Sequence, residues 1–339
     1  MRQVTIKDIA QIAGVSYSTV SRALSGSSEV SEATRSRILE ICNKEGYRVN
    51  ALARGLISNK TNMIGVIVPD VSNPFFSDLV FNIEKCAKNS GYTIMLCNNM
   101  YNTNETHDLF DLLLGYQVDG IIVAGSNDEA ITWMNDYIDV VPFLLIGDAL
   151  FDNDSCSFNT VSIDNKWGGY LAGKYLCELG HREIAYLGLR RSSIVHRARF
   201  DGFCESLEQY NISPIVLENL GKFSSMTVGY ELGKELLSNK TKCTSVFASS
   251  DTLALGTMQA ADEFKISIPE DLSLIGFDNI VYTNLPRIGI TTIDQRTLDL
   301  AKTAVELLLK IISNEEENKN IHSVLKPKLV ERTSCIVLK

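Results

Sequence analysis

The chain has 339 residues, of which 45% are hydrophobic and 22% are charged, a composition typical of globular rather than disordered proteins. Its net charge of −9 is unevenly distributed: residues 1–60 carry nine Lys/Arg and five Asp/Glu, whereas the rest carry 23 and 36. The front of the chain therefore has a balance of +4 and the body one of −13. This argues against a polyanion partner for the body and favours one for the N-terminal segment.

Length and cysteine spacing bound the organisation further. A chain this long exceeds one ordinary core, so at least one small and one large unit are expected. The eight cysteines form no CxxC pair, which favours buried thiols in a reducing cytosol over a metal site or a disulfide framework. The start MRQVTIKDIA lacks an apolar signal core, and no apolar run reaches 18 residues. We therefore expect a cytoplasmic protein with no membrane partner.

The first expected helix begins at Thr5, an N-cap with Asp8 three residues later, and ends at Gly14. Its apolar face has helical spacing and consists of Ile6, Ile9, Ala10 and Ala13. Ser16 caps the next helix, in which Val20, Ala23 and Leu24 point inward. Two helices joined by a short turn that contains glycine form a helix-turn-helix, whose second helix enters the major groove of DNA.

The outward face of this second helix is rich in hydrogen-bonding groups: Tyr17, Ser18, Ser21 and Arg22. Hydroxyls contact base edges or phosphates, and an arginine such as Arg22 grips guanine with two hydrogen bonds. Taken alone, a merely solvated helix face explains the pattern equally well. The basic balance of the same segment favours DNA.

A third helix is expected at residues 31–46, capped by Ser31, with Ile38, Leu39 and Cys42 pointing inward. The stretch that follows, YRVNALARGLISNK at residues 47–60, contains too little Gly, Ser or Pro for a bare linker. It is an amphipathic segment of about two turns, too short to be a stable helix alone.

VTIKDIAQIAGVSYSTVSRALSG, followed by TRSRILEICNKEGYRVNALARGL, resembles the headpiece of the lactose-repressor (LacI/GalR) family of bacterial transcription regulators. The resemblance implies that Tyr17, Ser18 and Arg22 face the major groove. It also implies further DNA contacts, to phosphates and through a hinge helix at 50–57, from Thr5, Ser16, Thr19, Ser21, Asn50, Ala53 and Leu56. Leu56 would wedge into the minor groove and kink the duplex. Val49 departs from the proline that many members carry there.

From Met63 onward short apolar strands alternate with amphipathic helices. MIGVIVPD, YTIMLCNN, VDGIIVAG and PFLLIG are strands of a first half, and TVSIDN, EIAYLGL, SVFASS and LSLIGFDN of a second. Such alternation predicts parallel, doubly wound sheets with helices on both faces, in two lobes. Ligands bind beyond the carboxyl ends of such strands, so a site between the lobes is expected.

The body has no motif of an enzyme. It contains no GxGxxG or GxxxxGK[ST] after the first strand, no GxSxG and no HxxxH, so we expect no catalysis, cofactor or metal. His181, between a helix stop and a strand, is expected to have a turn or surface role.

The body also resembles this family, through IGVIVPDVSNPFFSDLV, VSIDNKWGGYLAGKYLCELGHREIAYLG, SSDTLALG, LSLIGFDN and LKPKLVERTSC. The resemblance implies a fold like that of periplasmic sugar-binding proteins, with the effector between the lobes. Mapped by motif, the implied effector contacts are Asn73, Phe75, Phe76, Asp164, Arg199, Ser250 and Asp278. Carboxylates such as Asp278 accept from sugar hydroxyls, and the Arg199 fork donates.

Several of these positions have a second interpretation. Arg199 and Asp278 can form a structural pair, and Phe75 can belong to the core between the lobes. Trp167 follows a helix start and is expected to be packed. Ser250 stands where many members have Asn, and Gly147–Asp148 stands where an Asp and another polar residue are frequent. Asp148 is therefore a further candidate for the cleft.

The chain is thus expected to be a DNA-binding regulator, most often a repressor, of a metabolic operon, controlled by a small carbohydrate effector. One headpiece covers half of a pseudo-palindromic operator, so a homodimer is expected on double-stranded DNA. Without leucine heptads after VERTSCIVLK, no coiled-coil tetramer is expected. The alternative from another class is a solute-binding protein whose front helices only pack.

The expected boundaries follow these patterns. The headpiece spans 1–47, the hinge 48–61 and the core 62–339. Within the core, lobe 1 comprises about 62–160 plus 291–323, and lobe 2 about 161–290 plus 324–339.

Overall fold

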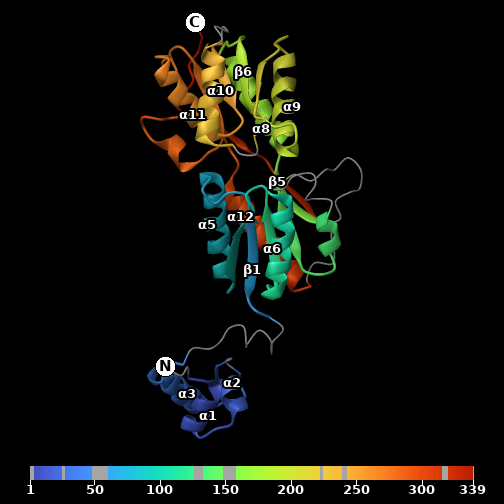
Figure 1. Cartoon of the computed structure of the whole chain (residues 1–339), viewed down its shortest axis with the longest axis vertical. Coiled ribbons are helices and arrows are strands. Elements are labelled where there is room, and N and C mark those ends of the chain that lie inside the picture. The colour runs from blue at the N-terminus through green and yellow to red at the C-terminus, as the bar shows by residue number, and fades with distance from the viewer. Residues whose placement is uncertain are drawn as a thin grey trace. The chain divides into compact units, whose positions relative to one another are not determined.

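The computed structural model describes residues 4–24, 27–47, 60–125, 133–147, 158–221, 224–238, 243–314 and 320–338. The chain falls into two compact units, Met1–Thr61 and Asn62–Lys339 (Figure 1). The expected hinge helix at 48–61 lies outside the described residues apart from its last two positions. No helix in the described residues is both long enough and apolar enough to cross a bilayer.

The first unit is a bundle of three helices: α1 (Ile6–Ala13), α2 (Tyr17–Leu24) and α3 (Glu32–Lys44). Their inward faces form one apolar core, in which Ile9, Val20 and Ile38 are fully buried. The chain turns from α1 to α2 through Gly14, whose φ of 61° lies in the left-handed region that glycine adopts without strain. The predicted helix-turn-helix is confirmed.

Side chains cap the starts of these helices. The Thr5 hydroxyl accepts from the Asp8 backbone N–H, and the Asp8 carboxylate accepts from the Thr5 N–H at 2.8 Å, so the predicted capping is present. Leu39 was expected to point inward, and this prediction was wrong, since its side chain is 44% exposed. Ile38 and Cys42 are four residues apart and share the buried face, whereas one step along the helix rotates Leu39 by about 100° away from it.

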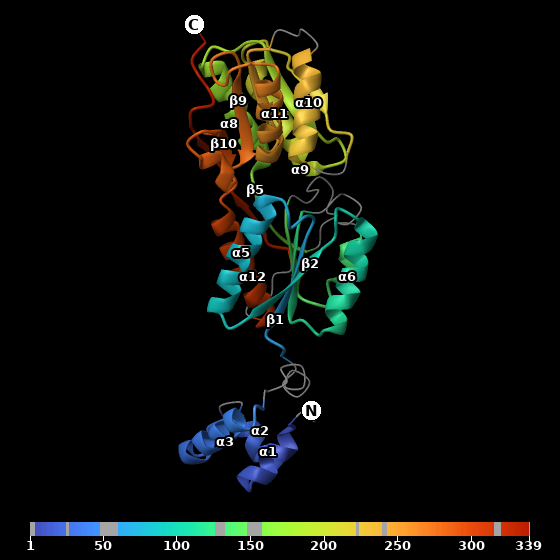
Figure 2. The same cartoon turned by 60° about the vertical axis from the view of Figure 1, so that its left-hand side comes forward.

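The second unit consists of two lobes, each built on a sheet of six strands in the described residues (Figure 1 and Figure 2). The sheet of lobe 1 is parallel throughout and has the order β11 (His322–Leu325), β5 (Asn159–Ile163), β4 (Phe143–Ile146), β3 (Gly120–Ala124), β1 (Met63–Val68), β2 (Thr93–Asn98). Helices α5 (Pro74–Asn89) and α12 (Thr297–Ile312) cover one face. Helix α6 (Thr103–Gly115) and the short η1 (Asn135–Tyr137) cover the other.

The sheet of lobe 2 has the order β12 (Lys328–Val330), β10 (Thr291–Asp294), β9 (Ser273–Asp278), β8 (Ser245–Ala248), β6 (Ile184–Leu189), β7 (Ile215–Glu218). Only β12 runs antiparallel within the described part of this sheet. Helices α8 (Asn165–Glu178) and α9 (Ile194–Glu208) cover one face, and α10 (Met226–Ser238) and α11 (Asp251–Glu263) cover the other. The short helix η2 (Val281–Asn284) follows β9. The predicted bilobal α/β core is confirmed.

Burial on both faces explains why the strands read as continuous apolar runs. In β1, Ile64 and Val66 pack under α5 and α12, whereas Ile67 packs under α6. A half-exposed strand would need a polar residue at every second position, and a parallel sheet sandwiched between helices does not.

The chain crosses between the lobes three times in the described residues, after β5, after β10 and after β11. The approximate lobe boundaries expected from the sequence therefore shift by a few residues: the described residues of lobe 1 fall within 62–163 and 297–325, and those of lobe 2 within 165–294 and 328–338. The physical reason is strand pairing. All of β5 pairs with β4 and β11, and all of β10 pairs with β9. The chain therefore passes to the other lobe only after each strand has ended.

His181 corrects another expectation, because it is 1% exposed rather than a turn or surface residue. Its ring nitrogens contact the hydroxyls of Thr244 and Ser273 at 2.9 and 3.0 Å, and the carbonyl of Ile336 at 3.2 Å. Burial lowers the pKa of this imidazole, which favours the neutral form. His181 thus joins three distant segments of lobe 2 and has a structural role.

The cysteines in the described residues are buried or half-buried and form no disulfide. Burial raises the pKa of the Cys177 and Cys335 thiols to about 11, so they remain protonated at neutral pH. This agrees with the expectation of inert thiols for every position except Cys156, which lies outside the described residues.

Candidate functional site

The outward face of α2 presents a preformed cluster of hydroxyls. Ser16 precedes the helix, and its Oγ accepts from the Thr19 N–H at 3.2 Å. The same oxygen lies 2.7 Å from the Ser18 hydroxyl and 2.8 Å from that of Thr19. Ser16 and Ser18 are exposed and Thr19 and Ser21 are half-buried. The helix start therefore offers hydroxyls and backbone N–H groups together, which is the chemistry that holds a phosphate.

Arg22 and Tyr17 flank this cluster. Arg22 Nε lies 3.1 Å from a Glu29 carboxylate oxygen, with the two side chains 56% and 65% exposed. Such a surface ion pair contributes about 1 kcal/mol or less, so Arg22 can exchange it for another anion or a base edge. Tyr17 is 47% exposed. Thr5 is exposed too, beside the N–H groups that begin α1, while Asn50, Ala53 and Leu56 lie outside the described residues.

A cavity of about 610 Å³ lies between the two lobes of the second unit, at the carboxyl ends of their strands. The structure brings six of the eight candidate effector residues to its wall: Asn73, Phe75, Phe76, Arg199, Ser250 and Asp278. Asp148 lies outside the described residues. Asp164 is absent from the described wall of the cavity.

Asp164 instead holds the start of α8. Its carboxylate accepts from the Trp167 backbone N–H at 2.8 Å, a capping contact that uses the position for local structure. Trp167, expected to be packed, is 41% exposed and stacks on Tyr170 with ring centroids 5.2 Å apart. Trp167 lies about one helical turn after Asp164, on the solvent side of α8. The spacing of apolar residues in the sequence did not reveal this exposure.

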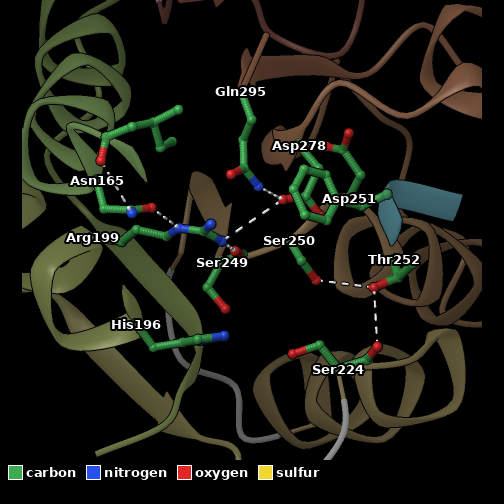
Figure 3. A network of polar contacts seen from close by, with 12 residues as sticks. Asn165, His196, Arg199, Ser224, Ser249, Ser250, Asp251, Thr252, Asp278 and Gln295 are labelled. Carbon is green, nitrogen blue, oxygen red and sulfur yellow. Dashed lines mark hydrogen bonds and ion pairs between the residues drawn. The ribbon is translucent and has the colours of Figure 1, made fainter. Parts of the chain in front are cut away.

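Arg199 makes several polar contacts at the cavity wall (Figure 3). Its Nε donates to Asn165 Oδ1 and a terminal nitrogen donates to the Ser249 carbonyl, each at 2.8 Å. Its guanidinium lies 3.6 Å from the Phe277 ring centroid and 3.8 Å from the Asp278 carboxylate. Arg199 and Asp278 therefore do form the structural pair considered above, and both still line the cavity.

Asp278 ends β9 with a φ of 122°, in a backbone region that side chains rarely adopt. Gln295 Nε2 donates to its carboxylate at 2.5 Å. Burial raises the pKa of Asp278 to about 6, although Arg199 opposes this rise. Behind it, burial raises the pKa of Asp251, which accepts from the Ile280 N–H at 2.9 Å. The site thus holds a carboxyl whose charge changes near neutral pH.

Two further candidates are helix caps that also face the cavity. Asn73 accepts from the Phe75 N–H at 3.0 Å at the start of α5, and Ser250 accepts from the Leu253 N–H at 3.3 Å at the start of α11. Phe76 is 9% exposed and belongs to the core of lobe 1. Phe75 is half-buried and packs against apolar clusters of both lobes, so the two interpretations of this ring, core and cavity wall, apply together.

Sequence reasoning missed several polar residues of the cavity: Asn99, Tyr101, Ser162, Asn165, Arg190, His196 and Gln295. His196 Nδ1 lies 3.3 Å from the Gly188 carbonyl, and burial lowers the pKa of its ring well below the usual value. A neutral ring that donates through Nδ1 leaves Nε2 as an acceptor, and His196 lines the cavity beside Arg199. Asn99 and Arg190 directly follow apolar strands, and that position was the available signal.

Two family profiles match separate parts of the chain. Residues 5–50 match the bacterial regulatory proteins of the lacI family, and residues 174–335 match the periplasmic binding protein-like domain. The repressor PurR of Yersinia pestis (strain Pestoides F) is 34% identical over 336 residues, which cover 97% of this chain and 96% of that protein. The chain belongs to the LacI family.

Solved structures of family members share the fold over most or all of the chain. The Lac repressor dimer bound to operator and the anti-inducer ONPF is 26% identical, with a TM-score of 0.87 over 99% of this chain and 100% of that one. The regulator CelR in complex with cellobiose is 25% identical, with a TM-score of 0.72 and coverage of 98% and 100%. A regulator from Enterococcus faecium with bound ribose is 32% identical, with a TM-score of 0.70 and coverage of 82% and 100%.

This LacI-family protein is a DNA-binding transcriptional repressor, and the relatives it matches are regulators rather than enzymes. The alternative of a solute-binding protein with packing helices in front is set aside, because the match to the regulator family begins at residue 5.

Proposed function

We propose that this repressor controls a metabolic operon by binding a pseudo-palindromic operator as a homodimer, in the bacterial cytoplasm and on nucleoid DNA. A sugar or sugar derivative in the interlobe cavity is the signal. The observation that carries the proposal is the cavity wall, which combines a forked guanidinium, a carboxyl, side-chain amides and phenyl rings. These groups match the hydroxyls and the apolar ring face of a sugar.

Names of relatives support this effector class. Cellobiose, ribose and D-xylulofuranose occur in the complexes of family members with this fold. In the present chain Asp278 and Gln295 would accept from and donate to vicinal hydroxyls, while Phe75 would meet the ring face. Arg199 is already held in place by Asn165 and the Ser249 carbonyl, so its binding geometry is set before the effector arrives.

On the DNA side we assign base reading to Tyr17, Ser18 and Arg22. Thr5, Ser16, Thr19 and Ser21 would hold phosphates, and Asn50, Ala53 and Leu56 would act in a hinge that folds on the duplex. Closure of the lobes on the effector would change the spacing of two hinges in a dimer. A tenfold change in operator affinity requires about 1.4 kcal/mol of differential effector binding between the two states.

The homodimer is supported by the Lac repressor dimer and by exposed apolar side chains on the second unit. Phe81 on α5, Val281 on η2 and Leu298 on α12 are 63%, 71% and 54% exposed. Large apolar side chains on neighbouring elements are typical of a surface that a partner covers.

The test selects sites from a random duplex library with purified protein and then titrates the winning site by gel shift. The proposal expects a two-fold symmetric site, and binding to random DNA that weakens steeply with salt. Sugars added to the same assay should change the affinity for the selected site and leave random DNA unaffected. Selection of no symmetric site would contradict the operator proposal, and no response to any sugar would contradict the effector class.

A further inference from the structure

A second arginine in the cavity, Arg190, is not held as Arg199 is. It follows β6, lines the interlobe cavity and is half-buried. Its Nε is buried and has no hydrogen-bond partner among the described residues. Its guanidinium lies 5.5 Å from the ring centroid of Tyr101, which reaches the cavity from lobe 1. No carboxylate within the described part of the chain lies at ion-pair distance from it.

Neighbouring arginines show that this is a particular feature of Arg190. Arg191, the next residue, places a terminal nitrogen 2.6 Å from Glu218 on the exposed surface. Arg199, in the same cavity, has Asn165, the Ser249 carbonyl and Asp278. Burial lowers the pKa of Arg190, so desolvation of this cation has a free-energy cost that no anion in the described part of the chain offsets. Such a group is typical of a site that a ligand completes.

The surroundings of Arg190 favour negative charge. Ser193, Val195 and His196, from the start of the 15-residue helix α9, line the same cavity, and a helix N-terminus attracts anions. Across the cleft, Ser162 is 2% exposed, and its Oγ has no hydrogen-bond partner in the described ranges of the chain. Burial raises the pKa of Tyr101 to about 12, so its phenol stays neutral and adds no competing charge.

We infer that the effector carries an anionic group, a phosphate ester or a carboxylate, which binds to Arg190 beside the start of α9. The sugar hydroxyls would then lie toward Arg199 and Asp278. This inference rests on the proposed function, because it assigns the chemical class of the effector for that same cavity. The anionic group would also bridge the two lobes, because it would bind Arg190 of lobe 2 while Ser162 and Tyr101 contact it from lobe 1.

The experiment measures thermal shift and calorimetric affinity of the full chain with ribose, glucose and cellobiose. The charged probes are ribose 5-phosphate, glucose 6-phosphate, gluconate and inorganic phosphate. We expect the phosphate esters or the sugar acid to stabilise the chain more than the neutral sugars, and the comparison between them separates the two anion types. Arg190→Gln should weaken binding of the charged probe about ten- to a hundredfold. Arg191→Gln, which removes an identical charge one residue away, should leave it unchanged.

Each other outcome has a definite meaning. A neutral sugar that binds wild type and Arg190→Gln equally well overturns the anion inference and leaves the proposed function intact. Absence of binding by every sugar and sugar anion overturns both. Inorganic phosphate that binds wild type as tightly as the charged sugars places an anion at Arg190 but contradicts the sugar part of the effector. Loss of apo stability in Arg190→Gln overturns the inference, because it would reveal a partner within the chain itself.

Discussion

Arg22 in the first unit and Arg199 in the second, both proposed to bind ligands, are held in opposite ways. Arg22 is exposed, and its ion pair with Glu29 is exposed too. Arg199 is 5% exposed and is held by an amide, a carbonyl, a phenyl ring and a carboxylate. The difference teaches that the exposed face of α2 can vary at little cost to folding, whereas the wall of the interlobe cavity is part of the core of lobe 2.

The largest expected effect is that of Arg199→Ala. Removal of one member of a buried pair leaves Asp278 without this cation and removes the Arg199 hydrogen bonds to the Asn165 and Ser249 oxygens, so the unfolding free energy should fall by about 3–5 kcal/mol. Denaturant titration of the second unit checks this. A loss below about 1 kcal/mol would show that the two arginines do not differ as described. Binding to random DNA, which depends on the first unit, should persist in this variant.

The pH dependence of stability tests the buried pair from the side of Asp278. Its pKa is about 6 in the folded chain, against the ordinary value of 3.8. Between these values the unfolded chain loses its proton first, so the unfolding free energy should fall by about 2 kcal/mol as pH rises from 4 to 6. Asp278→Asn should remove this contribution, seen as the difference between the two stability profiles without effector. Parallel profiles would contradict the raised pKa.

In contrast to Arg199→Ala, Arg22→Ala should weaken DNA recognition and change the stability of the chain little. Loss of a bidentate guanine contact should reduce discrimination between the selected operator and a scrambled duplex by about 1–3 kcal/mol. The unfolding free energy should change by less than about 1 kcal/mol. Lys60→Ala is the matched control, expected to lower affinity for all duplexes alike and to reduce the salt slope by about one. Unchanged sequence preference in Arg22→Ala would remove Arg22 from base reading.

The smallest expected effect is that of Thr5→Ala, which tests how much the N-cap contributes to the stability of α1 in the first unit. Loss of the cap should destabilise α1 by about 1 kcal/mol. Hydrogen exchange of the full chain should show weaker protection confined to residues 5–13. Protection unchanged there would mean that the buried Ile9 and Ala10, rather than the cap, determine the stability of the helix.

Local signals were read correctly from the sequence. Thr5 with Asp8, Gly14 and Ser31 mark helix ends because capping joins residues only three or four positions apart. Apolar runs such as MIGVIV correctly predicted buried parallel strands, because both faces of each strand pack against helices. Leu39 failed because its position beside Ile38 made the inward face ambiguous by one residue.

The site was only partly predictable. Asn73 and Asp164 look alike in sequence, each a polar residue after a strand and before a helix, yet Asn73 lines the cavity and Asp164 does not. The family resemblance placed both in the cleft. Which of them reaches it depends on the direction of the side chain relative to a lobe that is built from distant segments.

The sequence by itself therefore determined the helix-turn-helix, the two-lobed α/β body and the strand ends at which binding groups gather, because these depend on short-range periodicity. Only the tertiary structure decided the lobe boundaries, the pairing of Arg199 with Asp278 and the absence of such a partner for Arg190 within the described residues. Those features depend on contacts between segments far apart in the chain, and on the burial that shifts their charges.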